Sequence, residues 1–309
     1  MSAAPTLPIT DELPIAIRAY AGPAFRHLPE PSDAKVKRPR KDSVAPSSGR
    51  VLIFDTETES NAAQPLRFGT YQYRNGEALE EAGIFYDPEG VTADELIAIR
   101  NYATAHKLTL RTRDKFVDDV FFAQAYQHRA TIVGFNLPFD ISRLAIRHGT
   151  ARVPIDSETS TMRGAFTFAL SRQKIYPTIR VKHMSQKAAS ISFAAQMRQP
   201  DSRGQRNRGI RSGIRRGHFV DVKTLANAIF ARGFSLASLS QFLQVSNSKL
   251  DFDNFAGPVT EEMVRYAVRD VQATWECYDE LIDRFGKLNL TRTIPEKVYS
   301  EASIGKGYI

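Results

Sequence analysis

The chain has 309 residues, of which 42% are hydrophobic and 25% charged, and this is enough for a globular protein with a substantial core. Its apolar runs are too short for a membrane-spanning helix, which needs about 20 residues, and its N-terminus lacks the basic start and apolar run of a signal peptide. The only cysteine, Cys277, excludes an internal disulfide and a cysteine-based metal cluster. The net charge of +8 indicates a polyanionic partner.

The positive charge is concentrated in two segments. Residues 198–217 hold seven Arg and one Asp, and the first fifty residues hold eight Lys or Arg against five Asp or Glu, so the rest of the chain is close to neutral. Because residues 1–49 are also rich in proline, we expect a mostly disordered basic leader, with Pro14–Tyr20 as a candidate for a short docked helix. Its KVKRPRK stretch is either a solvated basic tail or a nuclear-localisation signal.

Hydrophobic patterning between residues 51 and 286 predicts an alternation of strands and helices. Short apolar runs predict strands over 51–55, 68–76, 78–88, 130–135, 164–171, 178–184, 188–196 and 218–222, with a turn at Asn75-Gly76. Helical spacing predicts helices over 92–106, 114–128, 136–149, 224–233, 235–245 and 260–286. For the helix at 136–149 we expect Asn136 as N-cap, Pro138 in the first turn and Gly149 as the stop. The fold class is therefore α/β, with a mixed sheet flanked by helices.

Four acidic residues stand out against this pattern. Asp55 and Glu57 end the first strand and face the same way, because strand side chains alternate with a period of two. Asp140 lies one helical turn after Asn136, and Asp270 lies one turn after Tyr266 in the last long helix. Each group taken alone also has a structural interpretation: a solvated strand end for the first pair, a helix N-terminus for Asp140, and a core position for Tyr266.

The order of these motifs resembles a known family. FDTET after a buried strand, GFNLPFD after a later strand and YAVRD in the last long helix are similar to the three motifs of the DEDD 3′–5′ exonucleases, and Tyr266 matches the tyrosine subtype. The resemblance spans Val51 to Gly286. It is nearest to the exonuclease domain of family B DNA polymerases of viruses, organellar plasmids and mobile elements, which the closing YSEASIGKGYI also resembles. Residues 50–289 are therefore predicted as the exonuclease domain, and 290–309 as the start of a polymerase region or the end of a stand-alone protein.

The resemblance implies a ribonuclease H-like fold and a two-metal mechanism. Two Mg²⁺ or Mn²⁺ ions would be held by Asp55, Glu57, Asp140 and Asp270, and Tyr266 would orient the attacking water. The expected partner is a single-stranded or frayed 3′ end of DNA, with RNA as a second choice, and with a polymerase region in cis. Contacts to the terminal nucleotides would come from Thr58, Asn136 and Phe139, of which Phe139 is equally a candidate for the core. Asp221 is expected to cap the following helix and not to bind metal.

The basic insert 198–217 and the overall activity leave alternatives. In the insert, Arg211, Arg215 and Arg216 are predicted to contact the nucleic-acid backbone, against the interpretation that the insert is solvated and never touches substrate. For the whole chain, the alternatives are an RNA 3′ exonuclease of the RNase D type and a non-catalytic nucleic-acid-binding module. The composition and the resemblance together favour a cytoplasmic protein from a bacterial, viral or mobile-element context.

Overall fold

The computed structural model describes residues 47–155, 158–185, 188–194, 217–247, 256–290 and 293–308. The predicted leader up to residue 46, with the candidate helix Pro14–Tyr20, lies outside these residues, and so does the basic insert up to residue 216.

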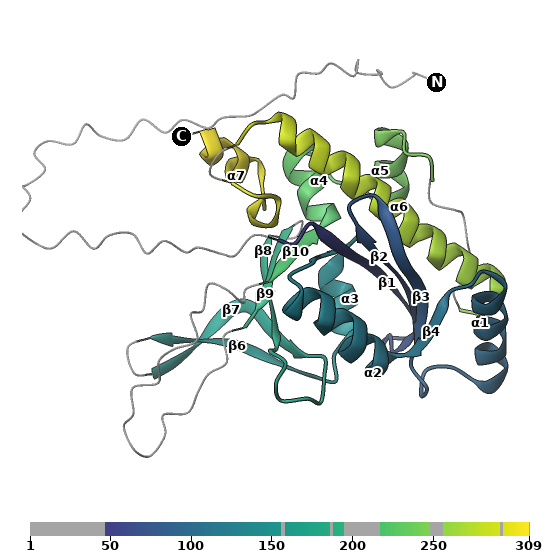
Figure 1. Cartoon of the computed structure of the whole chain (residues 1–309). Coiled ribbons are helices and arrows are strands. Elements are labelled where there is room, and N and C mark those ends of the chain that lie inside the picture. Colours follow the sequence, from purple (N-terminus) through teal and green to yellow (C-terminus); the bar gives the residue numbers. More distant parts are fainter. Residues whose placement is uncertain are drawn as a thin grey trace, which may run out of the picture.

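A mixed sheet of six strands forms the centre of the described structure, in the order β10-β5-β1-β2-β3-β4 (Figure 1). The strands are β1 (Arg50–Thr58), β2 (Leu66–Asn75), β3 (Ala78–Tyr86), β4 (Thr109–Thr112), β5 (Thr131–Gly134) and β10 (His218–Asp221). The first three pair antiparallel, β5 and β10 run parallel to β1 on its other side, and β4 runs parallel to β3. The sequence patterning accounts for every strand of this sheet except β4.

Helices cover both faces of the sheet, so β1 is buried on both sides. Leu52 and Phe54 belong to one core cluster and Val51 and Ile53 to another, as the alternation of strand side chains requires. The first cluster includes α3 (Leu137–Leu144) and the helical segment after β4, and the second includes α4 (Val222–Phe230), α5 (Leu236–Leu243) and α6 (Glu261–Lys287) (Figure 1). Full burial of one such apolar side chain contributes about 1.5–3 kcal/mol. A strand with this pattern can occupy only a central position in a layered fold.

Four helices form where the patterning predicts them. They are α1 (Ala93–Ala105), α4 (Val222–Phe230), α5 (Leu236–Leu243) and α6 (Glu261–Lys287). Each begins after a residue whose side chain accepts a hydrogen bond from a backbone N–H of the first turn, namely Thr92, Asp221, Ser235 and Thr260. The predicted N-cap role of Asp221 is therefore confirmed. These caps satisfy N–H groups that have no partner inside the helix.

The predicted helix at 114–128 is helical but is wound differently from an α-helix. After the single turn α2 (Arg113–Lys115), the chain passes through the π-helical segments η1 (Phe116–Phe121) and η2 (Ala123–Gln127). In a π-helix an N–H bonds the carbonyl five residues back, as that of Phe122 does to Val117. This wider turn brings the two phenylalanines at the ends of η1 into the same core cluster.

The prediction for 136–149 is wrong in two respects. The helix α3 (Leu137–Leu144) ends earlier, and Gly149 is not its stop but lies in β6 (Arg147–Ile155), because pairing with the next strand along the chain extends the backbone there. Asn136 precedes the helix in a left-handed conformation with φ of 73°, and its side chain makes no capping hydrogen bond. An N-cap residue has an extended backbone, so Asn136 cannot act as one.

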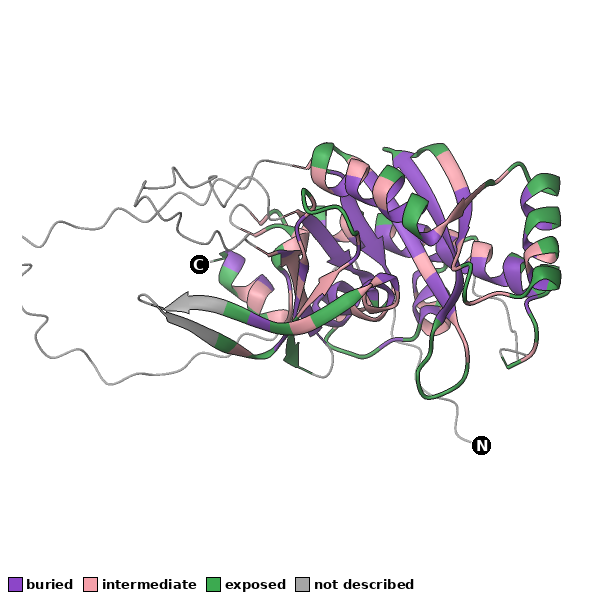
Figure 2. Ribbon diagram, turned by 90° about the horizontal axis from the view of Figure 1, so that it is seen from below, coloured by how far each residue is buried: buried purple, intermediate pink, exposed green. Residues whose placement is uncertain are grey.

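A second sheet has the antiparallel order β6-β7-β8-β9. The sequence patterning indicates its last three strands as hairpins but does not indicate β6. Its other strands are β7 (Glu158–Ala169), β8 (Ile179–Ser185) and β9 (Ala188–Phe193). The β6–β7 ribbon reaches away from the central sheet, and much of its described surface is exposed (Figures 1 and 2). The other two strands of this sheet pack against the body. Val181 of β8 and Phe193 of β9 belong to the core cluster of Leu52 and Phe54, and Phe193 packs edge-on against Phe219 of β10 at 5.1 Å between ring centroids.

The described part of the C-terminal segment packs back on the body. It contains η3 (Pro295–Lys297), α7 (Glu301–Gly305) and η4 (Lys306–Tyr308), and it buries Val298 and Ile304 in the same cluster as α4 and α6. Among the described residues, no helix combines the length and the apolar character needed to cross a membrane.

Candidate active site

The carboxyl end of β1 carries two of the predicted acids. Glu57 is buried and Asp55 is partly exposed, and both face the same side of the sheet because they are two residues apart on a strand. The neighbouring strand β2 approaches closely here, since a Cβ atom on Gly69 would lie 2.4 Å from the carbonyl oxygen of Asp55 and 2.2 Å from the ring of Phe85. Glycine at position 69 is therefore needed for β2 to pair with β1 beside the site.

Asp140 reaches the same strand end from the first turn of α3 and is only 2% exposed. Its Oδ1 accepts a 2.7 Å hydrogen bond from the hydroxyl of Thr56, which lies between Asp55 and Glu57 on β1. Its Oδ2 is buried and has no hydrogen-bond partner among the described residues. Burial raises the pKa of Asp140 well above its usual range, and the negative charge of Asp55 raises it further, while the hydrogen bond from Thr56 opposes the shift. A carboxyl group in this state favours either a proton or a nearby cation.

Asp221 holds the start of α3 in place, in addition to capping α4. Its Oδ1 accepts hydrogen bonds from the N–H groups of Asn136 (2.8 Å) and Leu137 (2.9 Å), and its Oδ2 accepts one from the N–H of Thr224 (3.0 Å). The two strands that end at these helices, β5 and β10, are parallel neighbours, so one carboxylate reaches both helix starts. Asp221 therefore supplies the capping oxygen that we expected from Asn136.

Tyr266 and Asp270 lie one turn apart on α6, and both are buried. Burial raises the pKa of Tyr266, and the negative charge of Asp270 raises it further, followed by the charge of Glu57, a hydrogen bond to Asp270 and the charge of Asp55. The phenol therefore stays protonated at neutral pH and acts as a hydrogen-bond donor. The charges of three of the four acids raise the pKa of Tyr266 in addition to burial, and α6 packs directly against β1.

Two groups of polar contacts fix α6 at this position. The hydroxyl of Thr70, which pairs with Asp55 across the β1–β2 ladder, donates to the carbonyl of Ala267 at 2.9 Å. This bond joins the residue after Tyr266 to the strand beside Asp55. It is buried, so water does not compete for it.

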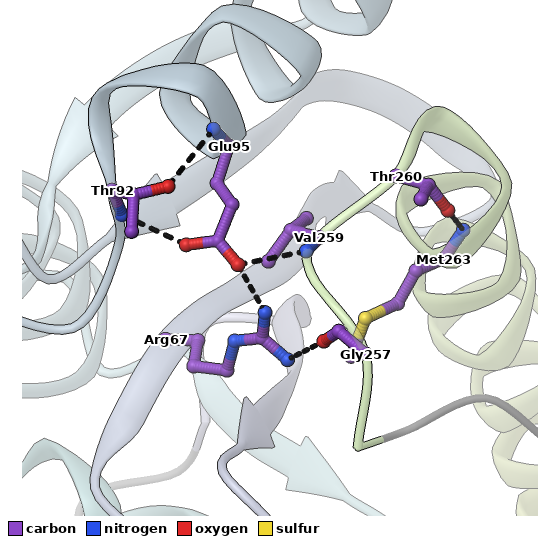
Figure 3. A network of polar contacts seen from close by, with 7 residues as sticks. All are labelled: Arg67, Thr92, Glu95, Gly257, Val259, Thr260 and Met263. Atoms are coloured by element: carbon purple, nitrogen blue, oxygen red, sulfur yellow. Dashed lines mark hydrogen bonds and ion pairs between the residues drawn. The ribbon is translucent and has the colours of Figure 1, made fainter.

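The second group is a buried network at the N-terminal end of α6 (Figure 3). The Arg67 guanidinium forms an ion pair with Glu95 of α1 and donates to the carbonyl of Gly257 at 2.9 Å, while Glu95 also accepts from the N–H of Val259 (2.9 Å) and of Thr92 (2.8 Å). Burial raises the pKa of Glu95, but these hydrogen bonds and the charge of Arg67 outweigh it and hold the pKa below its usual range. The network fixes the segment that leads into α6 and therefore the direction in which Tyr266 and Asp270 point.

The residues predicted to hold the terminal nucleotides surround this strand end. Thr58 is the last residue of β1, and a β-bulge separates it from Glu57. Asn136 is exposed, and Phe139 is half-buried outside the hydrophobic clusters of the described residues, with the Arg143 guanidinium 4.7 Å from its ring centroid. The stacking role of Phe139 stays a prediction. Arg211, Arg215 and Arg216 lie outside the described residues.

Three further side chains contribute to this site, although the sequence motifs do not point to them: Thr56, Thr70 and Arg143. Arg143 donates to the carbonyls of Ala63 (3.1 Å) and Gln64 (2.8 Å), so it ties the loop after β1 to α3. Of these three, only Thr56 has a recognisable position in the sequence. It lies between two acids on a strand, so its side chain points to the other face of the sheet from theirs. Among the described residues, no three His, Cys, Asp or Glu side chains already form a group that could hold a metal ion.

Comparison with known proteins gives no matching family profile and no matching curated protein. Among solved structures, the chain is similar to a structure of Phi29 DNA polymerase complexed with single-stranded DNA, with 14% sequence identity and a TM-score of 0.34. The match covers 79% of this chain and 32% of the polymerase chain, so this chain spans about a third of that protein.

Proposed function

We propose that the protein is a divalent-metal-dependent 3′–5′ exonuclease of the DEDD tyrosine subtype, built on a ribonuclease H-like sheet. Its proposed substrate is a single-stranded 3′ end of DNA, as for the proofreading domain of a family B-type polymerase. One observation carries the proposal: acids from β1, α3 and α6 come together at one end of the central sheet. Thr56, between Asp55 and Glu57, donates to Asp140 at 2.7 Å, and Thr70, opposite Asp55, donates at 2.9 Å to the carbonyl of Ala267, the residue after Tyr266.

The four carboxylates suit Mg²⁺ or Mn²⁺. They form an all-oxygen donor set, which is the preference of hard divalent ions. Asp140 also has a buried oxygen without a hydrogen-bond partner among the described residues, and its carboxyl group is repelled by Asp55. Such a group is costly to keep ionised unless a cation compensates it. We propose that Asp55, Glu57, Asp140 and Asp270 hold two ions, which when bound would lower the pKa of the attacking water and stabilise the leaving oxygen.

Tyr266 has a role of its own in this proposal. Because its pKa is raised by burial and by the surrounding carboxylates, its hydroxyl remains protonated and cannot serve as a general base at neutral pH. It is suited to hold the attacking water or a phosphate oxygen by a hydrogen bond. Thr58 and Asn136 would hold the sugar or phosphate of the last nucleotide, and Phe139 would stack its base, a contact that is tolerant of sequence.

The reaction is a hydrolysis at the last phosphodiester bond. A water oxygen forms a new bond to phosphorus, and the bond from phosphorus to the 3′ oxygen of the preceding nucleotide breaks. One proton leaves the water and one is taken up by the departing 3′ oxygen, so the products are a nucleoside 5′-monophosphate and a strand one nucleotide shorter with a free 3′ hydroxyl. The strand end must be unpaired, because the scissile bond has to reach the buried carboxylates.

The test uses 5′-labelled single strands of DNA and RNA with Mg²⁺, with Mn²⁺ or with EDTA. We expect a ladder that shortens from the 3′ end, requires metal and is abolished by Asp55→Ala, while the control Asp94→Ala, an exposed acid in α1, leaves it intact. Full activity of Asp55→Ala in a clean preparation would refute the site. Faster degradation of RNA would support the RNA exonuclease alternative, and binding without degradation would support the non-catalytic binding module.

A further inference from the structure

The second sheet contains a groove with an unusual charge. A cavity of about 540 Å³ opens beside β6 and β7 and the loop that joins β7 to β8. Four of the side chains that line it are cations and none is an acid; the cations are Arg147, Arg152, Arg172 and Lys174. All four are exposed, and none forms an ion pair with another described residue. We call these four residues and the cavity between them the basic groove.

The charged and hydroxyl groups of the groove favour anionic ligands. Thr150 and Thr178 also line the groove. Threonine hydroxyls commonly donate hydrogen bonds to phosphate oxygens in protein–nucleic acid contacts. Four like charges around one cavity repel one another and weaken the fold slightly unless a partner neutralises them. The arrangement therefore indicates a polyanion with several charges, spaced along a chain.

A second cavity lies between the basic groove and α3. That cavity, of about 580 Å³, shares Arg172 with the basic groove and is also lined by Ser142 and Arg143 of α3. Its lining is mixed in charge, because it also includes the acids Asp87, Glu89 and Asp114. The second cavity therefore brings the basic groove next to the helix that carries Asp140, although none of the proposed site residues lines either cavity.

We propose that the basic groove binds the phosphate backbone of a single-stranded nucleic acid, on the part of the strand that extends from the 3′ end held at the active site. That this strand is also the substrate of the active site rests on the proposed function. That the basic groove binds a single strand does not depend on it. A concave groove does not fit the flat surface of a lipid bilayer. An acidic peptide would match the charge, but the position of the groove near α3, the helix that carries Asp140, favours a strand that is also the substrate.

The experiment measures binding of the full-length protein to labelled DNA and RNA strands of about 20 nucleotides, in EDTA and over a series of salt concentrations. The groove variant is R147Q/R172Q/K174Q. The matched control is R100Q/K107Q/R129Q, which removes three exposed cations of the body that line neither cavity. Both variants keep the basic insert 198–217, so the comparison isolates the groove.

We expect the groove variant to bind more weakly and to flatten the slope of log K against log salt by about two, since each phosphate contact to a single strand contributes about 0.7. The control should retain the wild-type slope. Equal slopes for all three proteins, or an equal change in both variants, would overturn the proposal. So would a loss of binding to polyglutamate or to phosphatidylserine vesicles as large as the loss for nucleic acid.

The result separates this proposal from the proposed function. Binding is measured without metal, so a changed slope supports the groove even if the wild-type protein degrades no strand. A wild-type protein that degrades strands while the groove variant keeps its slope and affinity would refute the groove alone. Equal slopes for DNA and RNA would identify the shared phosphate backbone as the group that is bound.

Discussion

The candidate active site at the six-stranded sheet and the basic groove of the four-stranded sheet carry opposite charges in opposite surroundings. In the first, the acids Glu57, Asp140 and Asp270 are buried beneath helices on both faces. In the second, the cations of the basic groove are exposed on strands and on the loop after β7. One region holds anionic groups away from water, and the other holds cationic groups in water.

Buried and exposed charges place different demands on the residues around them. A buried charge costs several kcal/mol unless a partner compensates it, and the charges buried around the central sheet include defined contacts such as Thr56 with Asp140 and Arg67 with Glu95. An exposed cation is already solvated and needs no such contact. Single substitutions should therefore have large effects in the first region, and only combined substitutions should matter in the second.

The largest effect is expected for Asp140→Asn, in opposite directions for activity and stability. Even outer partners of metal ligands contribute about 10–100-fold, so loss of this carboxylate should reduce cleavage at least about a hundredfold. Asparagine keeps the acceptor for Thr56 but removes a charge that burial and Asp55 disfavour, so the metal-free protein should unfold at a higher temperature. The measurements are cleavage rate with Mg²⁺ and thermal unfolding in EDTA.

The pH dependence of that stability gain has a defined sign. The pKa of Asp140 is raised in the folded protein, so the ionised carboxylate destabilises the fold at pH values above its unfolded pKa of about 3.9. The gain in Asp140→Asn should be present at neutral pH and disappear as the pH falls toward that value. A gain that is independent of pH would mean that repulsion and burial of the charge are not its cause.

The next effect in size is expected for Arg67→Met. This substitution leaves Glu95 buried without its cation and the Gly257 carbonyl without its donor, and breaking one partner of a buried pair costs about 3–5 kcal/mol. The control Lys115→Met breaks an exposed pair with Asp119 and should cost less than about 1 kcal/mol. Urea unfolding measures both free energies, and the double variant Arg67→Met/Glu95→Met should recover part of the loss. Equal costs for the two single variants would remove the contrast between buried and exposed charges.

The smallest effect is expected for Phe166→Thr in β7. Phe166 is 44% exposed, and threonine suits a strand, so the free energy of unfolding should change by less than about 0.5 kcal/mol. The matched substitution in the central sheet is Phe85→Ala, at a ring that is fully buried and stacked on Phe116, and it should cost about 3–5 kcal/mol. If Phe166→Thr were as costly, this face of β7 would belong to the hydrophobic core and would not be exposed to water.

Much of the fold follows from local patterns. The alternation in β1 and the helical spacing in α6 depend only on neighbouring residues, and so do the turn at Gly76 and the cap at Thr92. Local geometry also puts Asp55 and Glu57 on one side of a strand, and Tyr266 one turn from Asp270. These relations hold whatever the strand or helix packs against, so they are visible in the sequence.

The tertiary structure alone decided the rest, because it depends on which distant residues meet. The start of α3 is capped by Asp221, which is 85 positions away from Asn136, and its end is set by the pairing of β6 with β7. The raised pKa of Asp140 requires both the burial of α3 and the approach of Asp55, and the basic groove exists only because β6 and the loop after β7 lie together. The order of the residues sets which side chains are available and how they are spaced along each element, whereas packing sets their neighbours, their exposure to water and therefore their charge state.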